Sequence, residues 1–133
     1  MSTDAASPPD EVSRFFDDYA RALLRRDITR LGQLYHVPAL ILFPGTSIVV
    51  TDAKQTEDFF SRAMAQYEGV HEAQPEIRVM GTGPGTVWAD VTWSYLGAPR
   101  ERFCYQLVTD DRGGYRIAVL TLLDQPSPPG APS

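Results

Sequence analysis

The chain has 133 residues, of which 43% are hydrophobic and 22% charged, and its formal net charge is −5. These values predict one ordinary soluble globular domain that can bury its own core without a metal or a disulfide. The negative charge argues against nucleic acid or an anionic membrane as the main partner. No apolar run approaches the roughly 20 residues of a membrane span.

Both ends of the chain are rich in Pro, Ser, Ala and Gly and carry few bulky apolar side chains. We therefore expect disordered tails over residues 1–7 and 125–133 and a folded domain over residues 8–124. The N-terminal segment has no basic region followed by an apolar stretch, so it does not predict a secretory signal. Cys104 is the only cysteine, which fits a reducing compartment. We expect a cytoplasmic protein in which Cys104 is a small buried side chain and not a nucleophile.

The first amphipathic segment predicts a helix that ends near Arg25. Ser7 and Pro8 have the form of a helix start, with Ser7 as the N-cap, Pro8 at the first helical position and Asp10 closing a pattern like a capping box. The apolar residues recur every three or four positions, as expected for one face against a core. They are Val12, Phe15, Phe16, Tyr19, Ala22 and Leu23.

A second helix, a hairpin and a third helix are expected next. Asp27 can cap a short helix that includes Tyr35 and that Pro38 stops. Residues 39–43 and 46–50 are apolar runs around Pro44-Gly45, which is a hairpin signal. The third helix is expected to follow a cap at Thr51 or Asp52. Its apolar stripe is Thr56, Phe59, Phe60, Ala63, Met64 and Tyr67.

The segment from residue 86 to residue 96 is β-branched and aromatic and predicts a long central strand. Alternation places Trp93 and Tyr95 on a face that must be covered, and Trp88 and Asp90 on the opposite, outer face. We interpret Asp90 as an ordinary charge of a half-exposed strand. Three more strands are expected over residues 76–81, 100–109 and 115–123, joined by turns short enough for antiparallel hairpins. The order of elements predicts an α+β fold with helices gathered on one face of a curved sheet.

Four short motifs accompany this order of elements. They are Tyr19 ahead of Arg26-Asp27-Ile28, Leu34-Tyr35 before the hairpin, Phe43-Pro44-Gly45, and Tyr95-Leu96-Gly97 at the end of the long strand. Together they resemble the NTF2-like superfamily over nearly the whole domain. The resemblance implies an α+β cone with a curved, mixed but mainly antiparallel sheet wrapped around the N-terminal helices. Families of this fold include SnoaL-like polyketide cyclases, ketosteroid isomerases, limonene-epoxide-hydrolase-like enzymes and many proteins of no known activity.

Similarity to the ketosteroid isomerases implies positions for a pocket. Tyr19 falls where those enzymes keep the oxyanion-hole tyrosine, and Phe59 and Phe60 fall on an aromatic pair that lines the steroid pocket. Val91, Trp93 and Tyr95 fall on the pocket-facing positions of the strand. The full pocket that we expect is Phe15, Tyr19, Phe43, Phe59, Phe60, Met64, Val91, Trp93 and Tyr95.

The catalytic residues of the isomerases are not matched. Phe43 stands where those enzymes have the aspartate base, and a phenyl ring cannot accept a proton. Their second aspartate would fall near Tyr105 or Gln106. Proton abstraction by that mechanism is therefore not available. The Arg/Asp set of the epoxide hydrolases is not recognisable either.

Two functions from different classes follow from these observations. The first is a SnoaL-like protein that binds a hydrophobic small molecule, with catalysis left open and Tyr19 as the best candidate polar group. The second is a non-catalytic interaction module in which the same aromatic residues fill the core. The strand pattern places no carboxylate or histidine in phase with Trp93 and Tyr95, which favours the non-catalytic side.

No metal and no cofactor are expected. His36 follows a helix and His71 lies in a polar loop, and neither has ligand-like spacing with Cys104 or the carboxylates. Residues 81–85 are glycine-rich but lead into a strand, so they predict a turn and not a phosphate-binding loop.

The last strand predicts a homodimer. Ile117 and Val119 share one face and Leu120 and Leu122 the other, so both faces are apolar. We expect Leu120 and Leu122 to join Trp88 in an exposed patch on the outer face of the sheet, and such a patch marks an association surface. The resemblance implies dimerisation through this surface. Isolated surface leucines on a monomer are the alternative.

Overall fold

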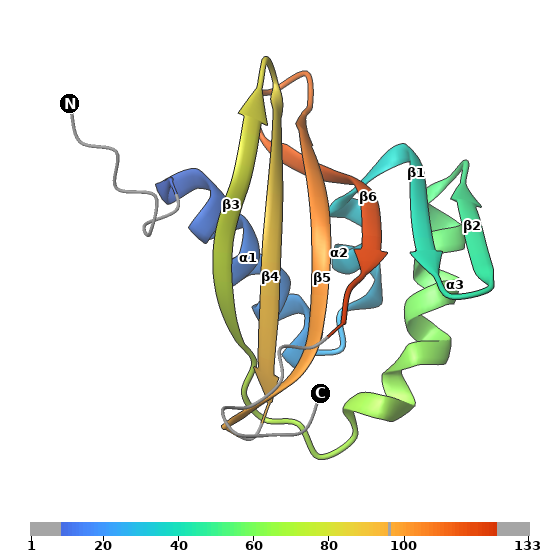
Figure 1. Cartoon of the computed structure of the whole chain (residues 1–133). Helices are drawn as coiled ribbons and strands as arrows, with labels where there is room; N and C mark the ends of the chain where they lie inside the picture. The colour runs from blue at the N-terminus through green and yellow to red at the C-terminus, as the bar shows by residue number, and fades with distance from the viewer. Residues whose placement is uncertain (1–8, 96, 125–133) are drawn as a thin grey trace.

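The computed structural model describes residues 9–95 and 97–124, and it shows three helices with a six-stranded sheet (Figure 1). In chain order the elements are α1 (Asp10–Leu24), α2 (Ile28–Gln33), β1 (Tyr35–Phe43), β2 (Thr46–Val50), α3 (Ala53–Ala63), the 3₁₀ helix η1 (Met64–Tyr67), β3 (Gln74–Gly83), β4 (Thr86–Tyr95), β5 (Ala98–Thr109) and β6 (Tyr115–Leu122). The two segments predicted as tails lie outside the described residues, and so does residue 8, which the prediction placed in the domain.

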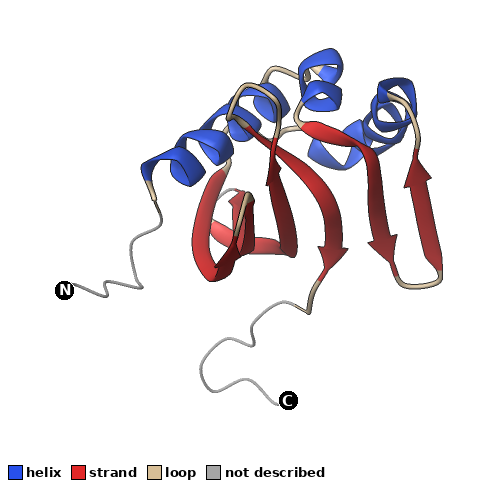
Figure 2. Cartoon of the chain, turned by 90° about the horizontal axis from the view of Figure 1, so that it is seen from above, coloured by secondary structure: helices blue, strands red, loops and turns tan. Residues whose placement is uncertain are grey.

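The strands lie in the order β2-β1-β6-β5-β4-β3. Only β1 and β6 of the described strands pair in parallel, and the other four pairs are antiparallel. The sheet curls, and all the helices drawn lie on one side of it (Figure 2). The predicted α+β fold, a mainly antiparallel curved sheet with helices on one face, is confirmed.

Helix α1 begins later than predicted. Its first residue is Asp10, and Pro9 occupies the N-cap position with no side-chain hydrogen bond. Ser7 and Pro8 lie outside the described residues. The proline still suits the boundary, since its fixed φ and missing N–H favour the start of a helix. The predicted apolar face of α1 is buried as a whole.

The second predicted helix is shorter than expected, and β1 longer. Asp27 caps α2 as predicted, accepting a hydrogen bond from the Arg30 amide at 3.0 Å. Tyr35, however, begins β1, where it is 1% exposed and pairs with Ile117. Pro38 lies within this strand. It is tolerated because the register between β1 and β6 is irregular there, so the missing amide interrupts no regular ladder.

Helix α3 is capped by Asp52, one of the two residues predicted for that position. The Asp52 side chain accepts from the Gln55 amide, and the Gln55 side chain accepts from the Asp52 amide, which completes a capping box. The apolar stripe then runs from α3 into η1 without a break in the chain. It places Phe60 and Tyr67 against the inner face of the sheet.

The placement of Leu120 and Leu122 on the outer face was wrong. Leu120 is 3% exposed, and both leucines face the inner side of the sheet together with Ile117. The reason is a β-bulge, because Leu107 pairs with Ile117 but the preceding Gln106 pairs with Val119. The extra residue on β6 reverses the alternation, which a strict period of two cannot anticipate.

Asp90 lies on the outer face as predicted, but it is buried and not an ordinary exposed charge. Its side chain is 8% exposed. Arg102 on β5 covers it, with Nε and Nη2 donating to the two carboxylate oxygens at 2.9 and 2.6 Å. This paired geometry offsets the cost of removing the carboxylate from water.

Candidate functional site

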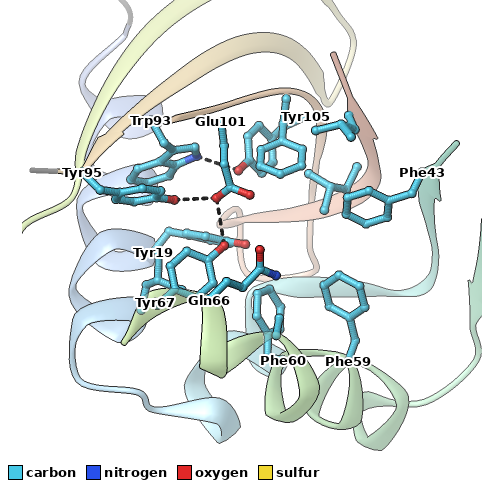
Figure 3. A pocket seen from close by; sticks show the side chains of 15 residues that line it. Tyr19, Phe43, Phe59, Phe60, Gln66, Tyr67, Trp93, Tyr95, Glu101 and Tyr105 are labelled. Atoms are coloured by element: carbon cyan, nitrogen blue, oxygen red, sulfur yellow. Dashed lines mark hydrogen bonds between the residues drawn. The ribbon is translucent and has the colours of Figure 1, made fainter. Parts of the chain in front are cut away.

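A cavity of about 220 Å³ lies between the inner face of the sheet and the segment formed by α3 and η1 (Figure 3). Among the described residues, fifteen side chains line it and nine of them are aromatic; the half-buried Phe59 and the exposed Gln66 come from the helical side. The lining residues are Tyr19, Leu23, Phe43, Phe59, Phe60, Ala63, Gln66, Tyr67, Trp93, Tyr95, Glu101, Phe103, Tyr105, Leu120 and Leu122.

Six of the nine residues predicted for the pocket line this cavity. They are Tyr19, Phe43, Phe59, Phe60, Trp93 and Tyr95. The other three do not line it. Phe15 packs edge-on against Phe16 in the core, Val91 is fully buried on the same face of β4, and Met64 packs against the core from η1. Leu120 and Leu122, predicted for a dimer interface, line the cavity instead.

The aromatic rings form a continuous cluster. Trp93 and Tyr95 are stacked at an interplanar angle of 12° with centroids 6.4 Å apart, and the Tyr19 ring lies 5.7 Å from that of Trp93. On the other side of the cavity Phe43 stacks on Phe59 at 5.8 Å. Such offset and edge contacts add stability beyond the area that they bury.

Glu101 places a carboxylate in this aromatic cavity. Its Oε1 accepts hydrogen bonds from the hydroxyls of Tyr67 and Tyr95, each at 2.9 Å, and Figure 3 shows both hydroxyls turned toward it. Its second oxygen, Oε2, takes no hydrogen bond from the described residues. The register explains the position, because Glu101 pairs with Trp93 across β4 and β5 and therefore points to the same face.

Glu101 was not predicted for the site, and the expectation that no carboxylate is in phase with Trp93 and Tyr95 was wrong. The signal was present in the strand itself. Glu101, Phe103, Tyr105 and Leu107 share one parity, and the last three are apolar or aromatic residues that face the core. Alternation along β5 alone thus predicts that Glu101 faces inward.

The hydroxyls around the cavity are neutral donors. Burial raises the pKa of Tyr67 and of Tyr95 well above the usual value for tyrosine, and the negative charge of Glu101 adds to the rise. Both hydroxyls therefore stay protonated at neutral pH and donate to the carboxylate.

Tyr19, the predicted polar group, is engaged elsewhere. Its hydroxyl lies 3.0 Å from the Tyr35 hydroxyl, and burial raises the pKa of both groups. Trp93 Nε1 likewise donates to the Tyr105 hydroxyl at 2.8 Å. Glu101 is therefore the better candidate for a polar contact with a bound molecule.

The remaining candidate residues lie away from the cavity. His36 belongs to β1, where Nδ1 is 2.9 Å from the Pro38 carbonyl, and His71 is exposed. Cys104 is half-buried on the outer face of β5, and burial raises the pKa of its thiol, which disfavours the nucleophilic thiolate. Within residues 9–95 and 97–124, no three His, Cys, Asp or Glu side chains gather as metal ligands do. The helices of the same ranges include none that is long and apolar enough to cross a membrane.

Known structures share this fold across most of the chain. An NTF2-like protein of unknown function from Shewanella oneidensis MR-1 has a TM-score of 0.69 and 14% identity, with 89% of this chain and 100% of that chain covered. Aln2 from a Streptomyces species has a TM-score of 0.65 and 19% identity, covering 88% and 92%. ActVI-ORFA from Streptomyces coelicolor has a TM-score of 0.65 and 12% identity, covering 86% and 94%. Identities this low establish the fold and not the chemistry.

Sequence comparison assigns the family. No curated protein matches the sequence. The family model described as NTF2-like protein (DUF6841) matches residues 10–125, which includes every helix and strand of the described structure. The chain therefore belongs to this NTF2-like family, as its cone of curved sheet and helices also indicates.

Proposed function

We propose that the protein binds a small hydrophobic molecule in the cavity between the sheet and the segment of α3 and η1. The observation that carries the proposal is an aromatic cavity of about 220 Å³ whose wall includes one carboxylate, Glu101. Apolar walls with a few convergent polar groups are the usual composition of a ligand site. An engineered apolar cavity of about 150 Å³ holds benzene, so this volume suits a single ring with a short substituent.

Glu101 gives such a ligand an orientation. Tyr67 and Tyr95 hold Oε1, and no other described residue donates to Oε2, so Oε2 is the atom that we expect to accept a hydrogen bond or a proton from the bound molecule. A carboxylate so placed is the group that a general base requires. The proposal covers binding; a reaction would need a substrate with an acidic proton within hydrogen-bond reach of Oε2.

A thermal-shift screen with small ring compounds tests this proposal. A ligand at 100 times its dissociation constant adds about 2.7 kcal/mol to the free energy of unfolding. Ala63 lines the cavity, whereas the nearby Ala65 is exposed and does not. Ala63→Phe should fill the cavity and abolish the shift, and Ala65→Phe should preserve it. Compounds that stabilise both variants equally, or the absence of any stabilising compound, would contradict the proposal.

A homodimer formed through the outer face of the sheet is a second candidate function. It is supported by a row of cross-strand partners, Trp88-Gln106-Val119-Leu40-Val49, that crosses five strands on that face. Trp88, Leu40 and Val49 are 37%, 38% and 55% exposed. Clustered apolar side chains of this kind mark association surfaces.

Light scattering decides between dimer and monomer. We expect twice the mass of one 14.8 kDa chain at micromolar concentration, and Trp88→Glu should give a folded monomer because it places like charges in an isologous contact. Ala65→Glu, on the exposed part of η1, is the matched control and should leave the mass unchanged. A wild-type mass of one chain argues against this candidate.

We also propose a cytoplasmic location for the protein, because its single cysteine fits a reducing compartment.

A further inference from the structure

The charge of Glu101 distinguishes this cavity from a simple apolar pocket. Among the described residues that line the cavity, Glu101 is the only charged one, and none is Lys, Arg or His. The groups that stabilise the carboxylate from within the cavity are two neutral hydroxyls on Oε1. A carboxylate beside apolar walls gains most from a positively charged partner, because the low dielectric strengthens the attraction.

The rings around the carboxylate favour the same partner. Tyr67 packs edge-on against Tyr95 with centroids 5.6 Å apart, and Tyr95 stacks along Trp93, so three electron-rich aromatic groups adjoin Glu101. The negative face of an aromatic ring attracts a cation within about 6 Å of its centre, and Trp does so best. An anion would be repelled by the carboxylate of Glu101.

We propose that the ligand of the cavity is an organic cation, a protonated amine attached to a single aromatic or aliphatic ring. The ammonium group donates to Oε2 of Glu101, and the ring packs among the aromatic side chains at the other end, near Phe43 and Phe59. This inference rests on the proposed function, since it names the ligand class of the same cavity. It predicts a fixed order of affinity, with the cation first, a neutral alcohol second and an anion last.

Three probes of matched size test the order. They are 2-phenylethylamine, which is protonated at pH 7, 2-phenylethanol, which is neutral, and phenylacetate, which is an anion. Calorimetric titration of the wild-type protein should give the amine at least about tenfold tighter binding than the alcohol, corresponding to about 1.4 kcal/mol, and phenylacetate the weakest binding. Added salt should weaken the binding of the amine and leave that of the alcohol unchanged.

Glu101→Gln is the informative variant, because its amide oxygen can still accept from Tyr67 and Tyr95 while the charge is lost. It should bring the amine to the affinity of the alcohol. The control is Glu72→Gln, which removes an exposed charge outside the lining residues and should preserve the tenfold preference. Circular dichroism confirms that both variants are folded.

The outcomes separate the two proposals. If the alcohol binds as tightly as the amine, or the preference survives in Glu101→Gln, the cation proposal is wrong while the ligand-binding cavity stands. If phenylacetate binds most tightly of the three probes, the cation proposal is likewise wrong and the ligand-binding cavity stands. If Ala63→Phe leaves the binding of all three probes unchanged, or none of them binds, the cavity is not a site for ligands of this size and both proposals fail.

Discussion

The ion pair between Asp90 and Arg102 should respond unequally to the loss of either partner. The Asp90 side chain is 8% exposed and that of Arg102 is 29% exposed. Arg102→Met leaves a buried carboxylate without its two donors, and breaking a buried pair in this way costs about 3–5 kcal/mol. We expect the lower end, because the neighbouring Arg78 pairs with Asp90 across β3 and β4 and its charge also favours the carboxylate. Asp90→Asn leaves a guanidinium that water reaches. This substitution should therefore lower the free energy of unfolding by about 1.5 kcal/mol, the net value of a charge-assisted hydrogen bond.

Urea unfolding at pH 7 measures both free energies. The contact between Arg102 and Asp90 also helps to hold the register between β4 and β5. That register pairs Glu101, the residue before Arg102, with Trp93 in the cavity. Equal losses of stability in the two variants, or a larger loss in Asp90→Asn, would show that the unequal burial of the two side chains does not set their contributions.

The pH dependence of the same variants has a definite sign. Hydrogen bonds from Arg102 lower the pKa of Asp90 in the folded protein, despite the opposing effect of burial. The stabilisation is therefore fully present above the unfolded value of about 3.9 and is lost as the pH falls through the lowered folded value. The stability difference between wild type and Asp90→Asn should shrink as the pH falls from 5 to 2. In Arg102→Met the partner is gone, so burial should raise the pKa of Asp90 and the variant should recover stability relative to wild type on acidification. Parallel curves for all three proteins would contradict this account.

Three further predictions concern buried hydroxyls. Thr56 Oγ1 is buried with no hydrogen-bond partner among the described residues, so Thr56→Val should raise the free energy of unfolding by about 1 kcal/mol in urea; a loss would show that the hydroxyl has a partner. Tyr95→Phe removes a donor to Glu101 and should lower the free energy of unfolding by about 1–2 kcal/mol. The control is Tyr115→Phe, because the Tyr115 hydroxyl makes no hydrogen bond within the described ranges, and it should leave the free energy of unfolding unchanged in the same assay. Burial raises the pKa of five of the six tyrosines in the folded protein. Absorbance at about 295 nm should therefore show these five ionising only together with alkaline unfolding. Because the unfolded chain releases these protons first, the free energy of unfolding should fall as the pH rises above about 10. Reversible ionisation of these five tyrosines near pH 10 in the folded protein would contradict their burial.

The fold could be predicted because its signals are local. The cap at Asp52, the hairpin at Pro44-Gly45 and the alternation of β4 each depend on a few neighbouring residues, and the structure agrees with all three. The order of these elements then indicated the cone. The start of β1 was missed because Tyr35 is held by Ile117, a partner far away in the chain.

The aromatic part of the candidate site was predicted from the sequence, whereas its carboxylate, Glu101, was missed although the alternation of β5 indicated it. Trp93 and Tyr95 follow from the period of one strand, but the burial of Asp90 depends on a diagonal contact with Arg102 from another strand. The face of the sheet on which Leu120 lies depends on a β-bulge that no residue of β6 indicates. Glu101 is a different case, because the alternation along β5 predicts the inner face of the sheet and only the charge of the side chain favours an exposed position.

The two tryptophans allow the most direct test of the ligand-binding cavity. Trp93 lines the cavity and is 1% exposed, whereas Trp88 lies on the outer face of the same strand and is 37% exposed. Their indole N–H resonances can be followed in a ¹⁵N-labelled sample during titration with 2-phenylethylamine. We predict a saturable shift of the Trp93 resonance while that of Trp88 stays in place. A titration that moves neither resonance, or only that of Trp88, would contradict a ligand site inside the cone.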